Sequence, residues 1–296
     1  MFSVVREEFQ ATHWYVATGL AGYCWEAVSP VAVVLLQHGY GEYACRYYHQ
    51  HSRLIQRLIE LNISVYAFDM HGHGGSTGKK GDTDIRKAVS EHQIARQIIA
   101  KTRLPLYLIG HSLGGLVTAG SVAQNSEGVD GVVLLSPAIV NPATVIGDPI
   151  LIALSRLLKP FPVTHLGKPE GLSRDPAQVE RFLKDPHCYA KAANGLLGMT
   201  ALSVSNSCWR RAKNWQAPVL LLHGTDDQYT SCDASSALFK KLAVEDKEQV
   251  LYEGFRHELL NDDAENLVTD KLIGWVLNRI SARLIDDAET RAFQSV

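Results

Sequence analysis

Five short apolar runs, rich in Val, Ile and Leu and bounded by glycine or proline, constrain the fold of this 296-residue chain most. Polar and apolar residues do not alternate along them, as expected for strands that are buried on both faces of a parallel sheet. The runs are VAVVLLQHG (31–39), ISVYAFDMHG (63–72), LPLYLIGHS (104–112), GVVLLSP (131–137) and APVLLLHG (217–224).

The segments between these runs carry apolar residues at helical spacing. Strands that alternate with helices predict a doubly wound α/β sheet, mostly parallel and with helices on both faces. The predicted helices of the first half cover residues 47–61, 84–102 and 113–125.

The two ends of the chain complete this pattern. Residues 4–28 predict two or three leading strands that pair antiparallel at the sheet edge. After the run that ends at residue 224, the pattern predicts a helix at 233–243, a strand at 248–254 and a closing helix from about 263 to 281.

The segment from 141 to 215 interrupts the alternation, because no buried strand is predicted there. It contains an apolar helix candidate at 149–158, a proline-rich turn at 159–169 and two further helical stretches. We therefore expect a helical cap inserted between two late strands. The predicted division is 1–140 for the first part of the core, 141–215 for the cap and 216–296 for the second part of the core.

Composition narrows the class of protein. An apolar fraction of 46% and a net charge of -2, with acids and bases interspersed, indicate a globular protein without a nucleic-acid-binding face. Five scattered cysteines without a C-x-x-C pair predict reduced thiols. The charged N-terminus lacks a signal-peptide core, and the longest apolar stretch is interrupted by Arg156 and Lys159. We expect a cytoplasmic location.

Ser112 lies in GHSLG, after a predicted strand and before a predicted helix. The pattern G-x-S-x-G is typical of a sharp strand-to-helix turn that exposes a nucleophilic hydroxyl, with Gly110 and Gly114 avoiding clashes across the turn. The alternative is a serine that only caps the helix. The strand–turn–helix context favours the nucleophile.

A serine nucleophile needs a base and an acid that orients the base. After a G-x-S-x-G turn, the three groups follow one another along the chain in the order serine, acid, histidine. The base is then expected after the last strand, where His257 lies. The acid is expected after the run 217–224, where Asp226 and Asp227 are adjacent. Only one of them can face the imidazole, and the residues alone do not decide between them.

The loop after the first run predicts an oxyanion hole formed by the backbone N–H groups of Tyr40 and Leu113. The pair His71 and His73 could suggest a metal, but Gly-Gly-Ser follows instead of further ligands. We therefore predict no metal and no cofactor.

Six sequence blocks, in order, resemble monoacylglycerol lipases and lysophospholipase-like serine α/β hydrolases. The blocks are QHGYGEYACRYY, FDMHGHGGSTG, GHSLGG, LSRDPAQVERFLKDP, VLLLHGTDDQYT and YEGFRHELLND. The resemblance implies an α/β-hydrolase fold with Ser112 as nucleophile, Asp227 rather than Asp226 as acid, and His257 as base. It also implies the same two oxyanion donors. The chain departs from the family at Tyr40, where a small residue is usual, and in the first half of the cap.

The expected function is hydrolysis of single-chain lipid esters, monoacylglycerol or lysophospholipid, through an acyl-enzyme intermediate. The apolar cap helix could also contact a membrane surface transiently. The alternatives are a carboxylesterase or a proline-iminopeptidase-like hydrolase on the same fold, or a non-catalytic ligand receptor. Dehalogenases and epoxide hydrolases share the fold but use an aspartate nucleophile, which Ser112 argues against.

Overall fold

The computed structural model describes residues 11–142, 148–159, 161–164, 168–263 and 266–294. Within them, the main sheet has the strand order β1-β2-β4-β3-β5-β6-β9-β10. The leading strands β1 and β2 pair antiparallel at one edge, and every pairing from β4 onward is parallel. These strands are β1 (Thr12–Trp14), β2 (Gly22–Trp25), β3 (Ala32–Gln37), β4 (Ile63–Phe68), β5 (Leu106–His111), β6 (Gly131–Leu135), β9 (Val219–Gly224) and β10 (Lys247–Tyr252).

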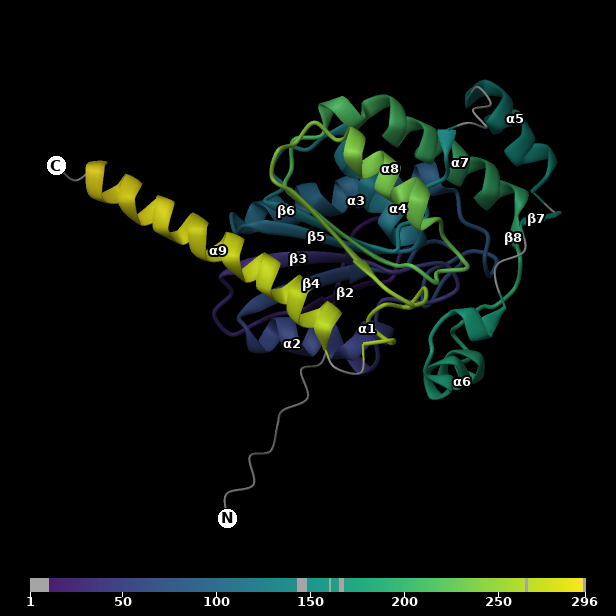
Figure 1. Ribbon diagram of the computed structural model, residues 1–296, viewed down its shortest axis with the longest axis horizontal. Helices are drawn as coiled ribbons and strands as arrows, with labels where there is room; N and C mark the ends of the chain where they lie inside the picture. The colour runs from purple at the N-terminus through teal and green to yellow at the C-terminus, as the bar shows by residue number, and fades with distance from the viewer. Residues whose placement is uncertain (1–10, 143–147, 160, 165–167, 264–265, 295–296) are drawn as a thin grey trace, which may run out of the picture.

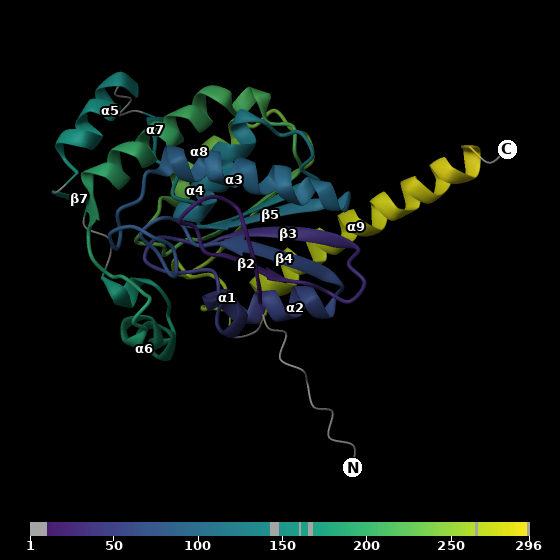
Figure 2. The same cartoon turned by 180° about the vertical axis from the view of Figure 1, so that it is seen from behind.

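Helices cover both faces of the sheet, as Figures 1 and 2 show. One face carries α3 (Ile85–Ile99), α4 (Leu113–Gln124), α7 (Gly195–Arg211) and α8 (Cys232–Lys241). The other carries α1 (Arg46–His49), α2 (Leu54–Glu60) and α9 (Leu267–Gln294). Short 3-10 turns lie at His51–Arg53, Ala100–Thr102, Pro169–Gly171 and Ala212–Asn214. The predicted α/β-hydrolase architecture is thereby confirmed.

Successive residues of one strand pack into two different cores, which explains the apolar runs. Val33 and Leu35 of β3 join the core under α3 and α4, whereas Val34 and Leu36 join the core under α2 and α9. All four side chains are buried. Because burying one such side chain contributes about 1.5–3 kcal/mol, both faces of the strand select apolar residues.

The predicted helix at 47–61 is interrupted. The chain forms α1, a turn at His51–Arg53 and α2, and the three turn residues have φ of 49°, 53° and 53°. The turn is held from outside, since the His51 N–H donates to Asn261 Oδ1 (2.6 Å) and the Ser52 hydroxyl donates to the Leu260 carbonyl. These partners lie about two hundred residues away, so helical periodicity could not reveal the break.

Between β6 and β9 the chain forms α5 (Asp148–Leu157), β7 (Pro162–Thr164), α6 (Pro176–Lys184), β8 (Ala193–Asn194) and α7. Figure 1 shows α5, α6, β7 and β8 together at one end of the sheet. The antiparallel pairing of β7 with β8 was not predicted. Strands of two and three residues are too short to show a period of two.

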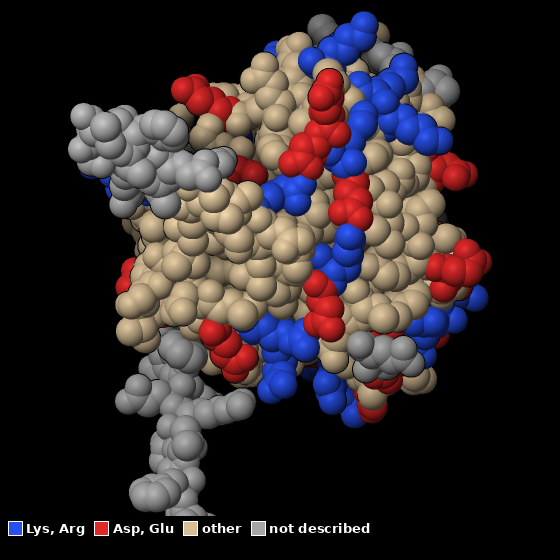
Figure 3. Space-filling view, turned by 60° about the vertical axis from the view of Figure 1, so that its left-hand side comes forward, with Lys and Arg blue, Asp and Glu red and all other residues tan. Residues whose placement is uncertain are grey.

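The closing helix α9 begins at Leu267 and runs to Gln294, past its predicted end at about 281. Its last turns extend beyond the rest of the molecule in Figures 1 and 2. No helix in the described part of the chain has both the length and the apolar character needed to cross a bilayer. On the face seen in Figure 3, acidic and basic residues are intermixed rather than segregated by sign.

Candidate active site

Ser112 lies at a strained turn between β5 and α4. Its φ of 55° and ψ of -119° are rarely adopted by residues other than glycine, and its N–H donates to the Leu135 carbonyl of β6 (2.9 Å). Ser112 occupies the N-cap position of α4, yet its side chain makes no capping hydrogen bond. The Ser112 side chain therefore does not cap the helix.

The two glycines of the motif are required by close backbone packing. A Cβ at Gly114 would lie 2.2 Å from the Gln37 carbonyl oxygen, and a Cβ at Gly110 would lie 2.5 Å from Thr118 Oγ1. Real Cβ atoms do not approach other atoms this closely. The start of α4 can therefore lie against β3 only if Gly114 lacks a side chain, and β5 can lie against α4 only if Gly110 lacks one.

The side chains of Ser112, His257 and Asp227 form one hydrogen-bonded chain. His257 Nε2 lies 2.8 Å from Ser112 Oγ, and His257 Nδ1 lies 2.9 Å from Asp227 Oδ2. All three come from loops at the carboxyl ends of strands β5, β9 and β10, where ligands bind in open parallel sheets. The histidine can accept the serine proton while the carboxylate holds the ring.

The neighbouring carboxylate points away from this chain. The Asp226 side chain is 53% exposed and forms an ion pair with Arg256 (3.7 Å), while its backbone N–H donates to the Phe255 carbonyl. The side chain of Asp227 is fully buried. Of the two aspartates that the residues alone left open, the one that faces His257 is Asp227.

Asp227 accepts hydrogen bonds beyond that of the histidine. Thr230 donates through its N–H (3.0 Å) and hydroxyl (2.8 Å), Tyr229 donates through its N–H (2.8 Å), and His223 Nε2 lies 3.1 Å away. Burial alone would raise the pKa of this carboxyl, but the charge of His257 and the bonds from His223 and His257 hold the pKa well below its usual range. Asp227 is therefore a fixed, ionised acceptor.

The Tyr40 and Leu113 N–H groups flank Ser112. Tyr40 follows β3, Leu113 is the first residue of α4, and both line the cavity that contains the Ser112 side chain. Within the described residues, neither N–H donates to a protein acceptor. Two unused donors beside a serine are what an oxyanion hole requires.

A buried imidazole joins the loop that carries Tyr40 to the segment that follows β4. The Met70 N–H donates to His38 Nε2 (3.0 Å), so this nitrogen is unprotonated and His38 Nδ1 donates to the Gly39 carbonyl (2.7 Å). Both bonds need a neutral ring with its proton on Nδ1.

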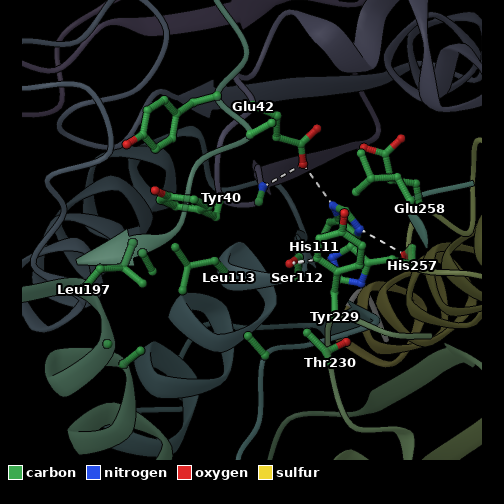
Figure 4. Close-up of a pocket in the computed structure, with 18 of the residues that line it drawn as sticks. Tyr40, Glu42, His111, Ser112, Leu113, Leu197, Tyr229, Thr230, His257 and Glu258 are labelled. Atoms are coloured by element: carbon green, nitrogen blue, oxygen red, sulfur yellow. Dashed lines mark hydrogen bonds and ion pairs between the residues drawn. The ribbon is translucent and has the colours of Figure 1, made fainter. Parts of the chain in front are cut away.

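A buried carboxylate, Glu42, joins the oxyanion loop to the nucleophile turn. Its two oxygens bond to five groups, namely Gly39 N (2.8 Å), Tyr47 Oη (2.7 Å) and His111 Nδ1 (2.9 Å) on Oε1, and Arg46 Nη1 (2.9 Å) and His51 Nε2 (2.9 Å) on Oε2. His111 immediately precedes the serine, and its Nε2 reaches the His257 carbonyl (3.3 Å). Figure 4 shows the bonds from Glu42 to the loop and to His111.

Arg46 extends these bonds to the loop that holds the base. It donates twice to Glu258, the residue after His257, at 2.5 Å and 3.0 Å.

Burial alone would raise the pKa of Glu42, but the charge of His51 and the bond from His111 keep that pKa well below its usual range. Burial alone would lower the pKa of His111, and its bond to Glu42 raises it instead. We call Glu42, Glu258, Arg46, His111 and His51 the buried charge network.

The donor atoms of Glu42, His51 and Glu258 lie close enough together to ligate a cation. The Arg46 guanidinium already donates to both carboxylates, so a cation is supplied by the protein itself. His71 and His73 also have protein partners, since His71 contacts Glu91 (3.0 Å) and His73 contacts Thr83.

Sequence reasoning did not identify His223, Tyr229 or the buried charge network. The Tyr229 ring stacks on the His257 ring, with centroids 4.9 Å apart. Glu42 and Arg46 are four residues apart in the block QHGYGEYACRYY, and this spacing of opposite charges in an apolar block was the available signal. Their link to Glu258 spans 212 residues and had no local signal.

A cavity of about 200 Å³ opens onto Ser112. In Figure 4, Tyr40, Leu113 and Leu197 lie on one side of the serine, and Glu258 and His257 lie on the other. Most of its lining is apolar, and the apolar lining residues include Val140, Ala193, Leu197, Ala201 and Leu202.

The parallel sheet, the strained serine turn and the order serine, aspartate, histidine define the class as an α/β hydrolase. The family described as serine aminopeptidase, S33, matches residues 28–264. The chain belongs to this family and is a hydrolase of the lipase and esterase type.

Among its relatives is the monoacylglycerol lipase of Mycolicibacterium smegmatis, 30% identical over 258 residues that cover 85% of this chain and 90% of the relative. The monoglyceride lipase of Rattus norvegicus is 28% identical and covers 86% of this chain and 84% of its own length. The crystal structure of Paleococcus ferrophilus monoacylglycerol lipase superposes with a TM-score of 0.75 at 32% identity, covering 88% of this chain and 99% of that one. The predicted resemblance to monoacylglycerol lipases is confirmed.

Proposed function

We propose that this chain hydrolyses the ester bond of single-chain lipid esters, monoacylglycerol or lysophospholipid, through an acyl-enzyme intermediate. The observation that carries the proposal is the hydrogen-bonded chain from Ser112 through His257 to Asp227 at the floor of an apolar cavity. The names of the relatives support monoacylglycerol as the substrate.

The proposed reaction has two halves. Ser112 Oγ attacks the ester carbonyl carbon as His257 Nε2 takes its proton, and the Tyr40 and Leu113 N–H groups stabilise the oxyanion. His257 then gives the proton to the departing alcohol. Water, deprotonated by His257, attacks the acyl-enzyme, and the fatty acid leaves as Ser112 regains its proton.

The peptidase alternative needs a free carboxylate in the cavity to bind the amino group of a peptide. Glu42 and Glu258 line the cavity, but both are already paired with Arg46. Among the lining residues that the structure describes, no carboxylate is free, and such an apolar cavity favours an ester with an apolar acyl chain over a peptide amine.

We further propose that residues 141–215 act as a cap over the cavity, between core parts 1–140 and 216–296. Exposed Ile150, Leu157 and Phe161 support a transient contact of this cap with a membrane surface. All five cysteines are unpaired, which supports a cytoplasmic location.

The test of the proposed function is a substrate panel. Purified protein is assayed on monoacylglycerol, lysophosphatidylcholine, p-nitrophenyl esters and prolyl-p-nitroanilide, with the Ser112→Ala variant beside it. The proposal predicts serine-dependent release of fatty acid from at least one lipid ester and no cleavage of the anilide. Cleavage of the anilide alone would support the peptidase, and no turnover of any substrate would support the receptor.

A further inference from the structure

The side chain of Tyr40 has no part in the chemistry proposed above, which uses only its backbone N–H. Yet the ring lines the cavity beside Ser112, on the same side as Leu113 and Leu197 in Figure 4. Because the proposed oxyanion donor is the N–H of the same residue, this large aromatic side chain occupies space next to the reacting carbonyl.

The ring is held on several sides. It packs edge-on against His73 (centroids 5.4 Å apart, 74° between planes) and against Tyr189 (5.7 Å, 80°), the favoured arrangement of aromatic pairs. Its hydroxyl reaches the loop at Gly81, where an added Cβ would lie 2.9 Å from Tyr40 Oη. A ring confined in this way cannot turn aside for a bulky ligand.

Tyr189 is itself fixed to the oxyanion loop. Its N–H donates to the Gly41 carbonyl (2.7 Å), and a Cβ at Gly41 would lie 2.0 Å from the Tyr189 carbonyl oxygen. Nearby, the Tyr43 hydroxyl donates to Asp185 (2.9 Å). Moving the segment around Tyr189 away from Tyr40 would therefore break its backbone hydrogen bond to the oxyanion loop.

If the ring were removed, the volume that it occupies would open to an apolar group. His73 is buried there, and burial lowers the pKa of His73 to about 3. The neutral imidazole of His73 would then become a wall of the cavity beside Tyr189, which already lines it.

We propose that the Tyr40 side chain closes the acyl end of the cavity and so sets the upper limit of acyl-chain length. This inference rests on the proposed ester hydrolysis and narrows its substrate to short and medium chains. The side chain is a specificity-determining group, distinct from the role of its backbone N–H.

The experiment measures kcat/KM on p-nitrophenyl acetate, butyrate, octanoate and palmitate for wild type, Tyr40→Ala, Tyr40→Leu and two controls. Wild type should prefer butyrate or octanoate to palmitate. In Tyr40→Ala the palmitate-to-butyrate ratio should rise by about tenfold or more, the scale on which a few methylenes act in apolar pockets. Tyr40→Leu should give an intermediate ratio.

Two control variants distinguish the loss of the cavity wall from a general effect on the fold. Tyr40→Phe keeps the ring and should keep the wild-type ratio. Tyr43→Ala removes a similar ring from the same loop, which is also tied to the cap segment but does not line the cavity, and should leave the ratio unchanged.

The inference is overturned if the wild-type kcat/KM on palmitate equals that on butyrate. It is also overturned if Tyr40→Ala and Tyr40→Leu keep the wild-type ratio, or if both are folded but inactive on every chain length. A wild-type protein that hydrolyses none of the esters in the panel would instead remove the proposed function.

Discussion

One of the two adjacent aspartates after β9 is buried and the other is exposed, so their substitutions should affect kcat to very different extents. Asp227→Asn removes the acceptor that holds His257 in the productive tautomer, and kcat should fall by about 10,000-fold, as in the trypsin template. Asp226→Asn breaks only an exposed contact with Arg256 and should change kcat little. Both variants are assayed on one p-nitrophenyl ester. An inactive Asp226→Asn beside an active Asp227→Asn would reverse the assignment.

Neutralising Glu42 should destabilise the fold, because Arg46 and His111 would lose their buried counter-charge. Glu42→Gln is expected to lower the free energy of unfolding by about 3–5 kcal/mol, the usual effect of breaking a buried pair. The measurement is urea denaturation followed by circular dichroism.

Glu180→Gln is the matched control for this variant. Glu180 pairs with Lys184 at the same spacing of four residues, but both side chains are exposed. Its loss should cost about 1 kcal/mol or less. Equal effects of the two substitutions would show that the buried charge network does not stabilise the fold.

His111 should make stability fall as the pH rises. Its pKa is raised in the folded state by the bond to Glu42, so its contribution is complete below the unfolded value of about 6.5 and is lost as the pH passes the folded pKa. The difference in unfolding free energy between wild type and His111→Gln, measured from pH 6 to 9, should therefore shrink as the pH rises. A difference that stays constant or grows with pH would contradict the raised pKa of His111 in the folded state.

Residue roles could be predicted where chain order and motif carry the information. Ser112 could be selected from a local motif, and His257 could be selected from its place after the last predicted strand. Asp227 needed the family resemblance. Glu258 and Asn261 could not be found, because their partners in the buried charge network and at the turn of His51 are more than two hundred residues away.

At the scale of single elements, α4 and α9 offer a matched pair of helical glycines. Gly114→Ala would force a Cβ to 2.2 Å from the Gln37 carbonyl and should destabilise the protein and displace the serine turn. No atom of the described residues lies within 4 Å of a Cβ built at Gly274 in α9. Gly274→Ala should therefore stabilise the protein by about 0.5–1 kcal/mol through helix propensity. Thermal unfolding of both variants is the measurement, and a melting temperature raised by Gly114→Ala would contradict the packing described here.

Elements were predictable where burial alone dictates composition. The five runs became β3, β4, β5, β6 and β9, because strands covered on both faces must be apolar throughout. The break between α1 and α2 and the pairing of β7 with β8 depend on tertiary contacts, so no local period indicated them. The end of α9 was placed too early, because its last turns lie beyond the sheet and lack the apolar stripe that marked its start.

At the scale of the whole molecule, the sheet brings three loops together at one edge. Ser112 and Asp227 are 115 positions apart and His257 follows 30 positions later, yet one hydrogen-bonded chain joins them. The two cores fix the strand ends, the buried charge network fixes the loops, and the cavity lies above. Turnover of a lipid ester needs all three features at once.

The most direct test of this central claim is covalent labelling of the serine. Wild type and Ser112→Ala are treated with a fluorophosphonate, and the adduct is located by intact-mass and peptide mass spectrometry beside an assay of ester hydrolysis. The expected result is one adduct per wild-type chain on Ser112, complete loss of hydrolysis with labelling, and a folded Ser112→Ala variant that neither labels nor hydrolyses. An adduct on another serine, or hydrolysis by Ser112→Ala near the wild-type rate, would contradict the assignment of the nucleophile.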